Sequence, residues 1–228
     1  AITFDLDNTL WDNTGIIESA DKAMIEKLRR LVPKKIGDCE TLPIQLIREK
    51  IAESEPGLVH RVSAMRKRVL TEWFITKGCE VEEANKLALI GFNEFYKERQ
   101  KIKFFPGVEE ILSNLSKLFP LGAITNGNAD ILSMPVGSFF KFSLTAEDFL
   151  APKPEKDIFL FAIKKLNVSP QNILHVGDNF NDDILGASLL GMRTAWITKK
   201  QSNPQNNVIP DLTLKTVTDL PKYIRLSD

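Results

Sequence analysis

Short apolar runs alternate with amphipathic segments over much of the chain. The run at residues 1–6 ends in acidic residues, and further runs of strand length lie at 121–125, 142–145, 172–176, 194–197 and 212–214. Apolar residues at helical spacing fill the segments between and after them, at 108–118, 158–166, 182–190 and 217–224. Strands that alternate with helices predict a parallel sheet with right-handed crossovers. We therefore expect an α/β fold with a Rossmann-like, doubly wound parallel sheet.

Residues 14–103 interrupt this alternation and are predicted to be almost entirely helical. Their apolar residues recur at helical spacing in four segments, at 17–31, 42–51, 58–74 and 81–96. Four amphipathic helices with short connections are typical of a small bundle. Because one strand precedes this region and the others follow it, we expect an α/β core domain of residues 1–13 and 104–228 with a four-helix domain, 14–103, inserted into it.

Composition excludes several classes of partner. Thirty basic and thirty acidic residues give a net charge of zero, so we expect no nucleic-acid partner. No apolar run approaches the ~18 residues of a membrane helix, so we expect no membrane partner. Two cysteines, Cys39 and Cys79, are too few for a disulfide framework. They favour reduced thiols and a cytoplasmic protein, which we expect to be a monomer or a homodimer.

Polar residues follow the predicted strands. The carboxyl ends of parallel strands meet at one edge of a sheet, where sites form. These residues are therefore expected to converge: Asp5 and Asp7 after the first strand, Thr125 and Asn126 at the second, Lys153 after the third, and Asp178, Asp182 and Asp183 after the fourth.

Their chemistry indicates a phosphate site. Asp5, Asp7 and Asp178 offer the hard oxygen ligands that suit Mg²⁺, and their charges repel one another unless a cation lies among them. Thr125 and the Asn126 amide are neutral donors, and Lys153 adds a positive charge. This set fits a phosphate dianion beside Mg²⁺, and it does not fit an apolar ligand or a nucleic-acid groove.

Four motifs occur in order along the chain. They are Asp5-x-Asp7-x-Thr9-Leu10, Thr125-Asn126-Gly127, Lys153-Pro154 and Gly177-Asp178-x4-Asp183. These motifs resemble those of the haloacid dehalogenase-like (HAD) phosphohydrolases. The resemblance covers nearly the whole chain, and it includes a helical cap inserted after the first motif, as in subfamily I of that family.

The resemblance implies a role for each motif. Asp5 would be the nucleophile that forms an aspartyl-phosphate, and Asp7 would be the general acid and base. Mg²⁺ would be held by the Asp5 carboxylate, the Asp7 main-chain carbonyl and Asp178. Thr125, the Asn126 amide and Lys153 would bind the transferring oxygens. The resemblance therefore implies a Mg²⁺-dependent phosphatase that hydrolyses a small-molecule phosphomonoester.

The last motif leaves an ambiguity, because the family uses two spacings after Gly-Asp. We favour Asp183 over Asp182 as its second acid, which would support the metal by holding its ligands or through a water molecule, without binding the ion itself. His175, on the strand before this motif, is interpreted as a packed, hydrogen-bonded histidine.

Three residues near or within the cap are candidates for substrate contact. Trp11 would stack on a planar or sugar moiety, or else pack against the connection to the cap. Arg61 and Arg66 would reach the leaving group, or else belong to a solvated helix face.

Several functions stay open at this stage. Segments 121–128 and 55–68 resemble a bacterial branch that hydrolyses FMN and 5-amino-6-(5-phosphoribitylamino)uracil, and a sugar phosphate is a further candidate substrate. A phosphomutase of the same fold and a catalytically idle HAD domain that binds a partner are the alternatives. Asp7 argues against a dehalogenase, because dehalogenation needs the nucleophile and no acid two residues later.

Overall fold

The computed structural model describes residues 1–37, 44–149, 151–199 and 208–224. Cys39 and the beginning of the helix expected at 42–51 lie outside the described residues. The chain forms two compact units, which are described separately below. Unit 1 comprises Ala1–Asp12 and Lys103–Asp228, and unit 2 comprises Asn13–Ile102.

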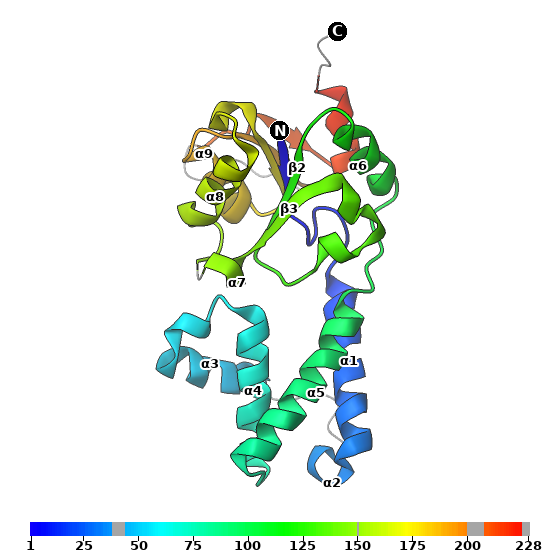
Figure 1. Ribbon diagram of the computed structural model, residues 1–228, viewed down its shortest axis with the longest axis vertical. Helices are drawn as coiled ribbons and strands as arrows, with labels where there is room; N and C mark the ends of the chain where they lie inside the picture. Colours follow the sequence, from blue (N-terminus) through cyan, green and yellow to red (C-terminus); the bar gives the residue numbers. More distant parts are fainter. Residues whose placement is uncertain (38–43, 150, 200–207, 225–228) are drawn as a thin grey trace. The chain divides into compact units, whose positions relative to one another are not determined.

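Unit 1 contains a six-stranded parallel sheet, which confirms the α/β fold (Figure 1). The strand order is β3-β2-β1-β4-β5-β6. In register, Ile2 of the central strand pairs with Leu121 on one side and with Leu174 on the other. The strands are β1 (Ile2–Phe4), β2 (Leu121–Thr125), β3 (Phe140–Thr145), β4 (Leu174–Gly177), β5 (Arg193–Ile197) and β6 (Leu212–Leu214).

Helices lie on both faces of the sheet, with α8 and α9 on one face and α6 on the other (Figure 1). Strand β2 is buried along its whole length, as a strand covered on both faces must be. One core cluster joins the sheet to α8 and α9 through residues that include Ile124, Phe159 and Ala187. The helices are α6 (Val108–Ser116), α7 (Ala146–Phe149), α8 (Lys156–Leu166) and α9 (Gly186–Ser188).

The structure differs from expectation at two of the predicted helices of unit 1. Residues Phe180–Leu185 form a π-helical turn before α9, where a regular helix was expected at 182–190. The last segment, Val217–Lys222, is a 3₁₀ helix with Pro221 inside it. Further short 3₁₀ segments that periodicity did not reveal are Ile131–Ser133, Pro135–Phe139 and Pro170–Asn172.

Unit 2 is helical. Helix α5 packs against α1 and α4, and Gly91 of α5 allows Leu28 of α1 to approach closely. Pro33 ends α1 and begins the short helix α2, which was not predicted. The helices are α1 (Thr14–Leu31), α2 (Pro33–Ile36), α3 (Ile44–Ser54), α4 (Val62–Thr76) and α5 (Val81–Arg99), with a 3₁₀ segment at Pro56–Leu58. Among the described residues, no helix has the length and apolar character needed to cross a membrane.

Candidate active site

A small hollow of about 180 Å³ lies where β1, β2 and β4 end. From β1 the chain adds β2 and β3 on one side of the sheet, and then β4, β5 and β6 on the other side. Open α/β sheets bind ligands at the point where this direction changes, which is called the switch point. The hollow brings the predicted residues of all four motifs together. It is lined by Asp5, Asp7, Asn8, Thr125, Asn126, Gly127, Lys153, Asp178, Asn179, Asp182 and Asp183.

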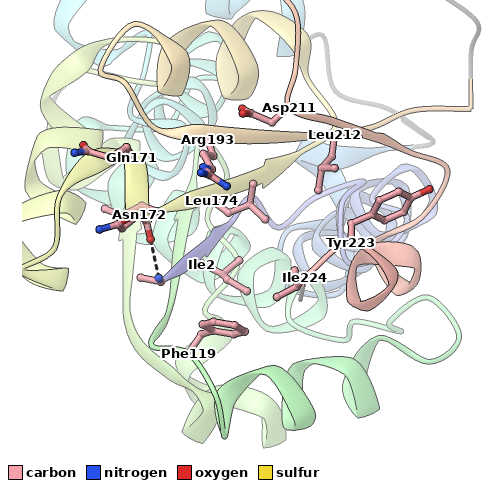
Figure 2. A pocket seen from close by; sticks show the side chains of 12 residues that line it. Ile2, Phe119, Gln171, Asn172, Leu174, Arg193, Asp211, Leu212, Tyr223 and Ile224 are labelled. Atoms are coloured by element: carbon pink, nitrogen blue, oxygen red, sulfur yellow. Dashed lines mark hydrogen bonds between the residues drawn. The ribbon is translucent and has the colours of Figure 1, made fainter. Parts of the chain in front are cut away.

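A second, wider hollow of about 650 Å³ opens at the opposite edge of the sheet (Figure 2). Its lining includes Ile2, Leu174, Arg193 and Leu212, which are the first residues of four strands. None of the predicted site residues lies in it.

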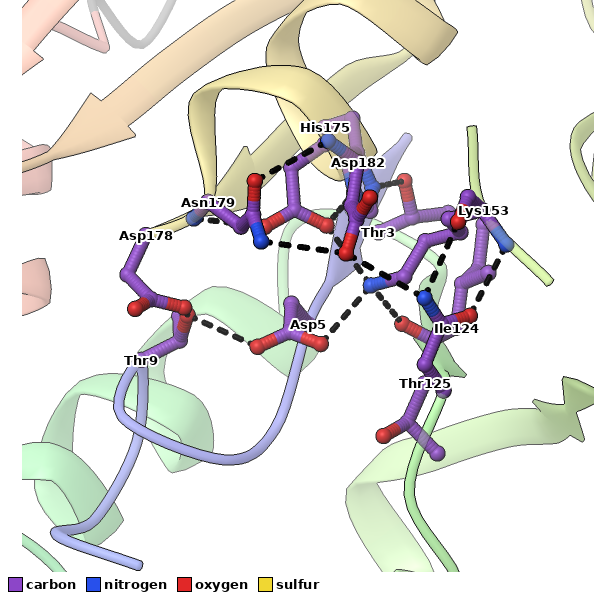
Figure 3. Close-up of polar contacts among 12 residues, drawn as sticks. Thr3, Asp5, Thr9, Ile124, Thr125, Lys153, His175, Asp178, Asn179 and Asp182 are labelled. Atoms are coloured by element: carbon purple, nitrogen blue, oxygen red, sulfur yellow. Dashed lines mark hydrogen bonds and ion pairs between the residues drawn. The ribbon is translucent and has the colours of Figure 1, made fainter. Parts of the chain in front are cut away.

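Lys153 is the centre of the site. Its side chain is buried, and its ammonium donates to Asp5 Oδ1 at 2.7 Å, to Asp183 Oδ1 at 2.6 Å and to the main-chain oxygen of Ile124 at 2.7 Å (Figure 3). An ammonium has three protons, so these bonds use all of them. Lys153 therefore fixes the Asp5 carboxylate at the end of β1.

Asp183 is held from three sides. Besides Lys153, its carboxylate accepts from the main-chain N–H of Asn179 at 3.0 Å and lies 3.2 Å from His175 Nε2. The other ring nitrogen of His175 lies 2.8 Å from the Thr3 hydroxyl. A carboxylate can only accept, so Nε2 carries the proton and Nδ1 accepts from Thr3. The buried histidine thus orients Asp183, in agreement with its interpretation as a hydrogen-bonded residue.

Asn126 has a role that the sequence did not indicate. Its side-chain carbonyl accepts from the main-chain N–H of Lys153 at 2.8 Å, and its amide N–H donates to the main-chain oxygen of Lys153 at 3.0 Å. The same amide nitrogen lies 3.3 Å from Asp182 Oδ2. The side-chain amide therefore fixes the backbone of Lys153, and the binding of a phosphoryl oxygen by Asn126 stays a prediction.

Two threonine hydroxyls complete the polar surface. Thr125 Oγ1 accepts from the main-chain N–H of Gly127 at 3.0 Å, which leaves its own proton for another acceptor. Thr9 Oγ1 donates to Asp5 Oδ2 at 3.0 Å and lies 3.4 Å from Asp178 Oδ1 (Figure 3). The role of Thr9 was missed, although its place four residues after Asp5 is part of the first motif.

The loop after β4 presents its acids through a glycine and a π-turn. A Cβ on Gly177 would lie 2.2 Å from the Asp183 carboxylate, so only glycine lets that side chain lie against the end of the strand. The Asn179 side chain accepts from the main-chain N–H groups of Asn181 and Asp182 and caps the turn. Asn179 was also missed, and a capping residue before a helix is the signal that would have found it.

Carboxylate oxygens of Asp5, Asp178 and Asp183 lie within 4.8 Å of one another, and this is the group in the described part of the chain that is able to hold a metal ion. Asp182 is outside it. Three hard anionic donors, of which only Asp5 and Asp183 bond to the Lys153 ammonium, fit a divalent cation with oxygen ligands. The Asp7 carboxylate is not part of this group, and a metal contact through the Asp7 main-chain carbonyl stays a prediction.

The electrostatics of the site are those of crowded, buried acids. Burial raises the pKa of Asp5 to about 7, and the charges of Asp183 and Asp178 add to this shift while Lys153 opposes it. Burial and the charge of Asp183 raise the pKa of Asp178 to about 6. Burial alone would raise the pKa of Asp183 as well, but Lys153 and His175 outweigh it and lower that pKa to about 2.

The pKa values of the two basic residues in this cluster, Lys153 and His175, are shifted as well. Burial favours the neutral form of Lys153, but Asp183 and Asp5 outweigh it, so its pKa lies above the usual range. Burial lowers the pKa of His175, which is therefore neutral at pH 7. Acids outnumber cations in this cluster, and a divalent cation would remove the imbalance.

Trp11 does not have the expected substrate-facing position. Its side chain is fully buried, so the ring offers no face to a ligand. It packs edge-on against Phe104, with ring centroids 5.5 Å apart, and its indole N–H donates to Asp7 Oδ1 at 2.8 Å. Stacking of Trp11 on a substrate is therefore wrong.

Arg66 lies on α4 of unit 2, and Arg61 directly precedes that helix. Arg66 forms an ion pair with Asp21, and its guanidinium lies 3.6 Å from the centroid of the Phe95 ring. The charge of Arg66 is therefore paired with a carboxylate of the same unit. Arg61 is exposed at the beginning of α4, and contact with a substrate stays a prediction for both arginines.

Two curated proteins with related sequences are phosphatases. The chain is 32% identical to 5-amino-6-(5-phospho-D-ribitylamino)uracil phosphatase YigB of Escherichia coli K12, over 98% of this chain and 95% of the relative. It is 31% identical to the glyceraldehyde 3-phosphate phosphatase of Pyrococcus abyssi, over 86% of this chain and 79% of that one.

Solved structures share the fold. A structure described as 2-haloacid dehalogenase from Pseudomonas syringae pv. tomato DC3000 matches with a TM-score of 0.91 and 36% identity, over 97% of this chain and 96% of the other. The family model for haloacid dehalogenase-like hydrolases matches residues 1–191. Together with the geometry of the four motifs, this match shows that the chain belongs to the haloacid dehalogenase-like hydrolases.

Proposed function

We propose that the protein is a Mg²⁺-dependent phosphatase that hydrolyses a small-molecule phosphomonoester through an aspartyl-phosphate on Asp5. One observation carries this proposal. The Asp5 carboxylate lies at the switch point of the sheet, held by Lys153 and Thr9, next to two further carboxylates that are able to hold a cation. A fixed carboxylate beside a cation site is the arrangement that nucleophilic attack on a phosphoryl group needs.

The first step forms the intermediate. An Asp5 oxygen forms a bond to phosphorus as the bond from phosphorus to the ester oxygen breaks. Asp7 gives its proton to that leaving oxygen, so the alcohol departs neutral. Thr125, through its hydroxyl proton, and Lys153, through its charge, stabilise the negative charge on the transferring oxygens.

The second step releases phosphate. Water attacks phosphorus while the Asp7 carboxylate takes a proton from it, and the bond from phosphorus to the Asp5 oxygen breaks. Asp5 is restored as a carboxylate and Asp7 as an acid, so the net reaction consumes one ester and one water. Both steps use the same Asp7 proton position in opposite directions.

The donor set supports Mg²⁺ as the cofactor. The Asp5 and Asp178 carboxylates and the main-chain carbonyl of Asp7 would hold the ion, and Asp183 would support the site by fixing Lys153. When bound, Mg²⁺ supplies positive charge that offsets the repulsion between the acids and the phosphate.

Residues 14–103 are proposed to act as a cap that selects the leaving group.

The relatives named above make a riboflavin-pathway phosphate ester the first candidate substrate and a small sugar phosphate the second. The test is phosphate release with Mg²⁺ from 5-amino-6-(5-phospho-D-ribitylamino)uracil, FMN, glyceraldehyde 3-phosphate and phosphoglycolate. We expect the highest kcat/KM with the first two. A flat response to both, with a strong response to sugar phosphates, contradicts the riboflavin assignment.

Three other functions are separated by product analysis. In ¹⁸O-labelled water a phosphatase places the label in free phosphate, whereas a phosphomutase retains the phosphoryl group on an isomer of its substrate. The likeness to a dehalogenase structure makes chloride release from 2-chloropropionate a necessary control, and we expect none because Asp7 lines the hollow. Absence of phosphate release from every ester would favour a non-catalytic binding domain.

A further inference from the structure

We propose that Trp11 is a positioning residue for the general acid Asp7, and this inference rests on the proposed function. Its indole N–H donates to Asp7 Oδ1 at 2.8 Å. The hydrogen bond joins a fully buried ring to a half-exposed carboxyl that lines the hollow. Trp11 would thus set the direction in which Asp7 presents its proton.

The backbone between the two residues makes this contact possible. Asn8 has a φ of 63°, a left-handed conformation that asparagine tolerates better than most residues. Its main-chain N–H donates to the main-chain oxygen of Trp11 at 2.7 Å. The chain thereby turns back on itself directly after Asp7, and the side chain of Trp11 reaches Asp7 within the same turn.

The ring of Trp11 is fixed from the other side. Phe104 meets it edge-on at an interplanar angle of 83°, and the main-chain N–H of Phe105 donates to the main-chain oxygen of Leu10 at 2.9 Å. Phenylalanine at position 11 would supply the same kind of packing. Only tryptophan adds a donor, and a buried indole N–H needs an acceptor, which Asp7 provides.

The bond favours one oxygen of Asp7 as the carrier of the transferable proton. An indole N–H can only donate, and the carbonyl oxygen of a protonated carboxyl is a better acceptor than its hydroxyl oxygen. Trp11 therefore favours the acidic proton on Oδ2, from which it leaves to the ester oxygen in the first step. In the second step the proton from water returns to Oδ2. Without Trp11 the carboxyl would lose this hydrogen bond, and the proton would be presented in the correct direction less often.

This role predicts a dependence on the leaving group. An alkoxide is a poor leaving group and needs the proton, whereas p-nitrophenolate leaves without one. In Trp11→Phe we expect kcat/KM for glycerol 3-phosphate or another alkyl phosphate that the wild type hydrolyses to fall by about tenfold or more, because a general acid contributes ~10²–10⁴. We expect kcat/KM for p-nitrophenyl phosphate to change by less than about threefold, because kcat/KM reports the steps up to departure of the alcohol and not the second step, which is common to both esters.

Two further variants make the test specific. In Asp7→Asn the same substrates should show a larger selective loss, and adding Trp11→Phe to Asp7→Asn should cause no further selective loss. Phe104→Leu weakens the packing of Trp11 and keeps its N–H, so it should change both substrates by the same factor. A uniform loss in Trp11→Phe, or an additive double variant, overturns the proposal.

A spectroscopic readout does not require the Trp11 variant to fold. The chain has three tryptophans, so the ¹H–¹⁵N spectrum holds three indole signals, which Trp73→Phe and Trp196→Phe assign by elimination. In Asp7→Ala we expect the Trp11 signal alone to shift strongly. An unmoved Trp11 signal overturns the proposal. If the wild type hydrolyses neither ester, the proposed function fails, whereas a non-selective loss in an active enzyme defeats this inference alone.

Discussion

At the scale of the residue, Lys153 holds the negative charges of the site together. It lies 3% exposed between Asp5 and Asp183 and bonds to both. Removal of one partner from such a buried group leaves uncompensated charge, which is costlier than the loss of a surface ion pair. The stability of unit 1 and the activity therefore depend on the same side chain.

Replacement of Lys153 by methionine should lower the free energy of unfolding by about 3–5 kcal/mol and abolish phosphate release. Urea unfolding followed by far-UV circular dichroism measures the first effect. Lys156→Met, at the exposed beginning of α8, is the matched control and should change stability by less than about 0.5 kcal/mol. Asp183→Asn added to Lys153→Met should recover part of the lost free energy of unfolding. Equal stability of Lys153→Met and Lys156→Met would contradict the account.

At the scale of the element, the ends of strands β1, β2 and β4 determine where the chemistry occurs. Strand β4 can end in an acidic loop only because Gly177 leaves room for Asp183. The π-turn at Phe180–Leu185 then gives its two acids different partners. The Asp182 carboxylate accepts from the side-chain amide of Asn179, whereas the buried Asp183 carboxylate accepts from the main-chain N–H of Asn179. Such turns are frequent at functional sites.

Gly177→Ala should therefore displace the Asp183 carboxylate and reduce kcat by about tenfold or more, because small misplacements of catalytic groups are costly. Steady-state phosphate release measures the effect. Gly15→Ala is the control, since nothing lies within 4 Å of a Cβ at that helical position. It should leave kcat unchanged. Wild-type kcat in Gly177→Ala would show that Asp183 has no positional role.

The sequence predicted the elements better than the contacts between them. Residues 121–125 were predicted as a strand and form β2, because a fully buried parallel strand has an uninterrupted apolar run. Asp5, Lys153 and Asp178 were predicted to lie at one edge of the sheet because each follows a predicted strand, and the carboxyl ends of parallel strands meet at one edge. The partners of Asn126 were not predictable, because its hydrogen bonds reach Lys153 and Asp182 in other loops and leave no periodic pattern. The bond from Trp11 to Asp7 was not predictable because it depends on the turn at Asn8. The π-turn was missed because its apolar spacing resembles that of an α-helix.

At the scale of the whole molecule, the acids of the site couple stability to pH and to metal. The pKa values of Asp5 and Asp178 are raised to about 7 and about 6, so the folded chain binds more protons than the unfolded chain between about pH 4 and pH 7. Stability that depends on these groups is therefore lost as the pH rises through this window. The lowered pKa of Asp183 acts in the opposite direction only below about pH 4.

The metal-free protein should consequently have a lower Tm at about pH 8 than at about pH 5.5, other groups being equal, and Mg²⁺ should raise Tm more at the higher pH. Thermal unfolding with EDTA and with excess Mg²⁺ at both pH values measures the difference. Asp178→Asn should weaken the response to Mg²⁺. A Mg²⁺ response of the same size at both pH values would contradict the assignment of these acids to the cation site.

The central claim is that Asp5 carries the phosphoryl group, and chemical trapping tests it most directly. Borohydride reduces an acyl phosphate to an alcohol, which would turn aspartate 5 into homoserine. The wild type, quenched during turnover of an alkyl phosphate with Mg²⁺, should yield homoserine at position 5 by peptide mass spectrometry, and Asp5→Asn or enzyme without substrate should yield none. Rapid turnover with homoserine absent, or found at another aspartate, would contradict the account.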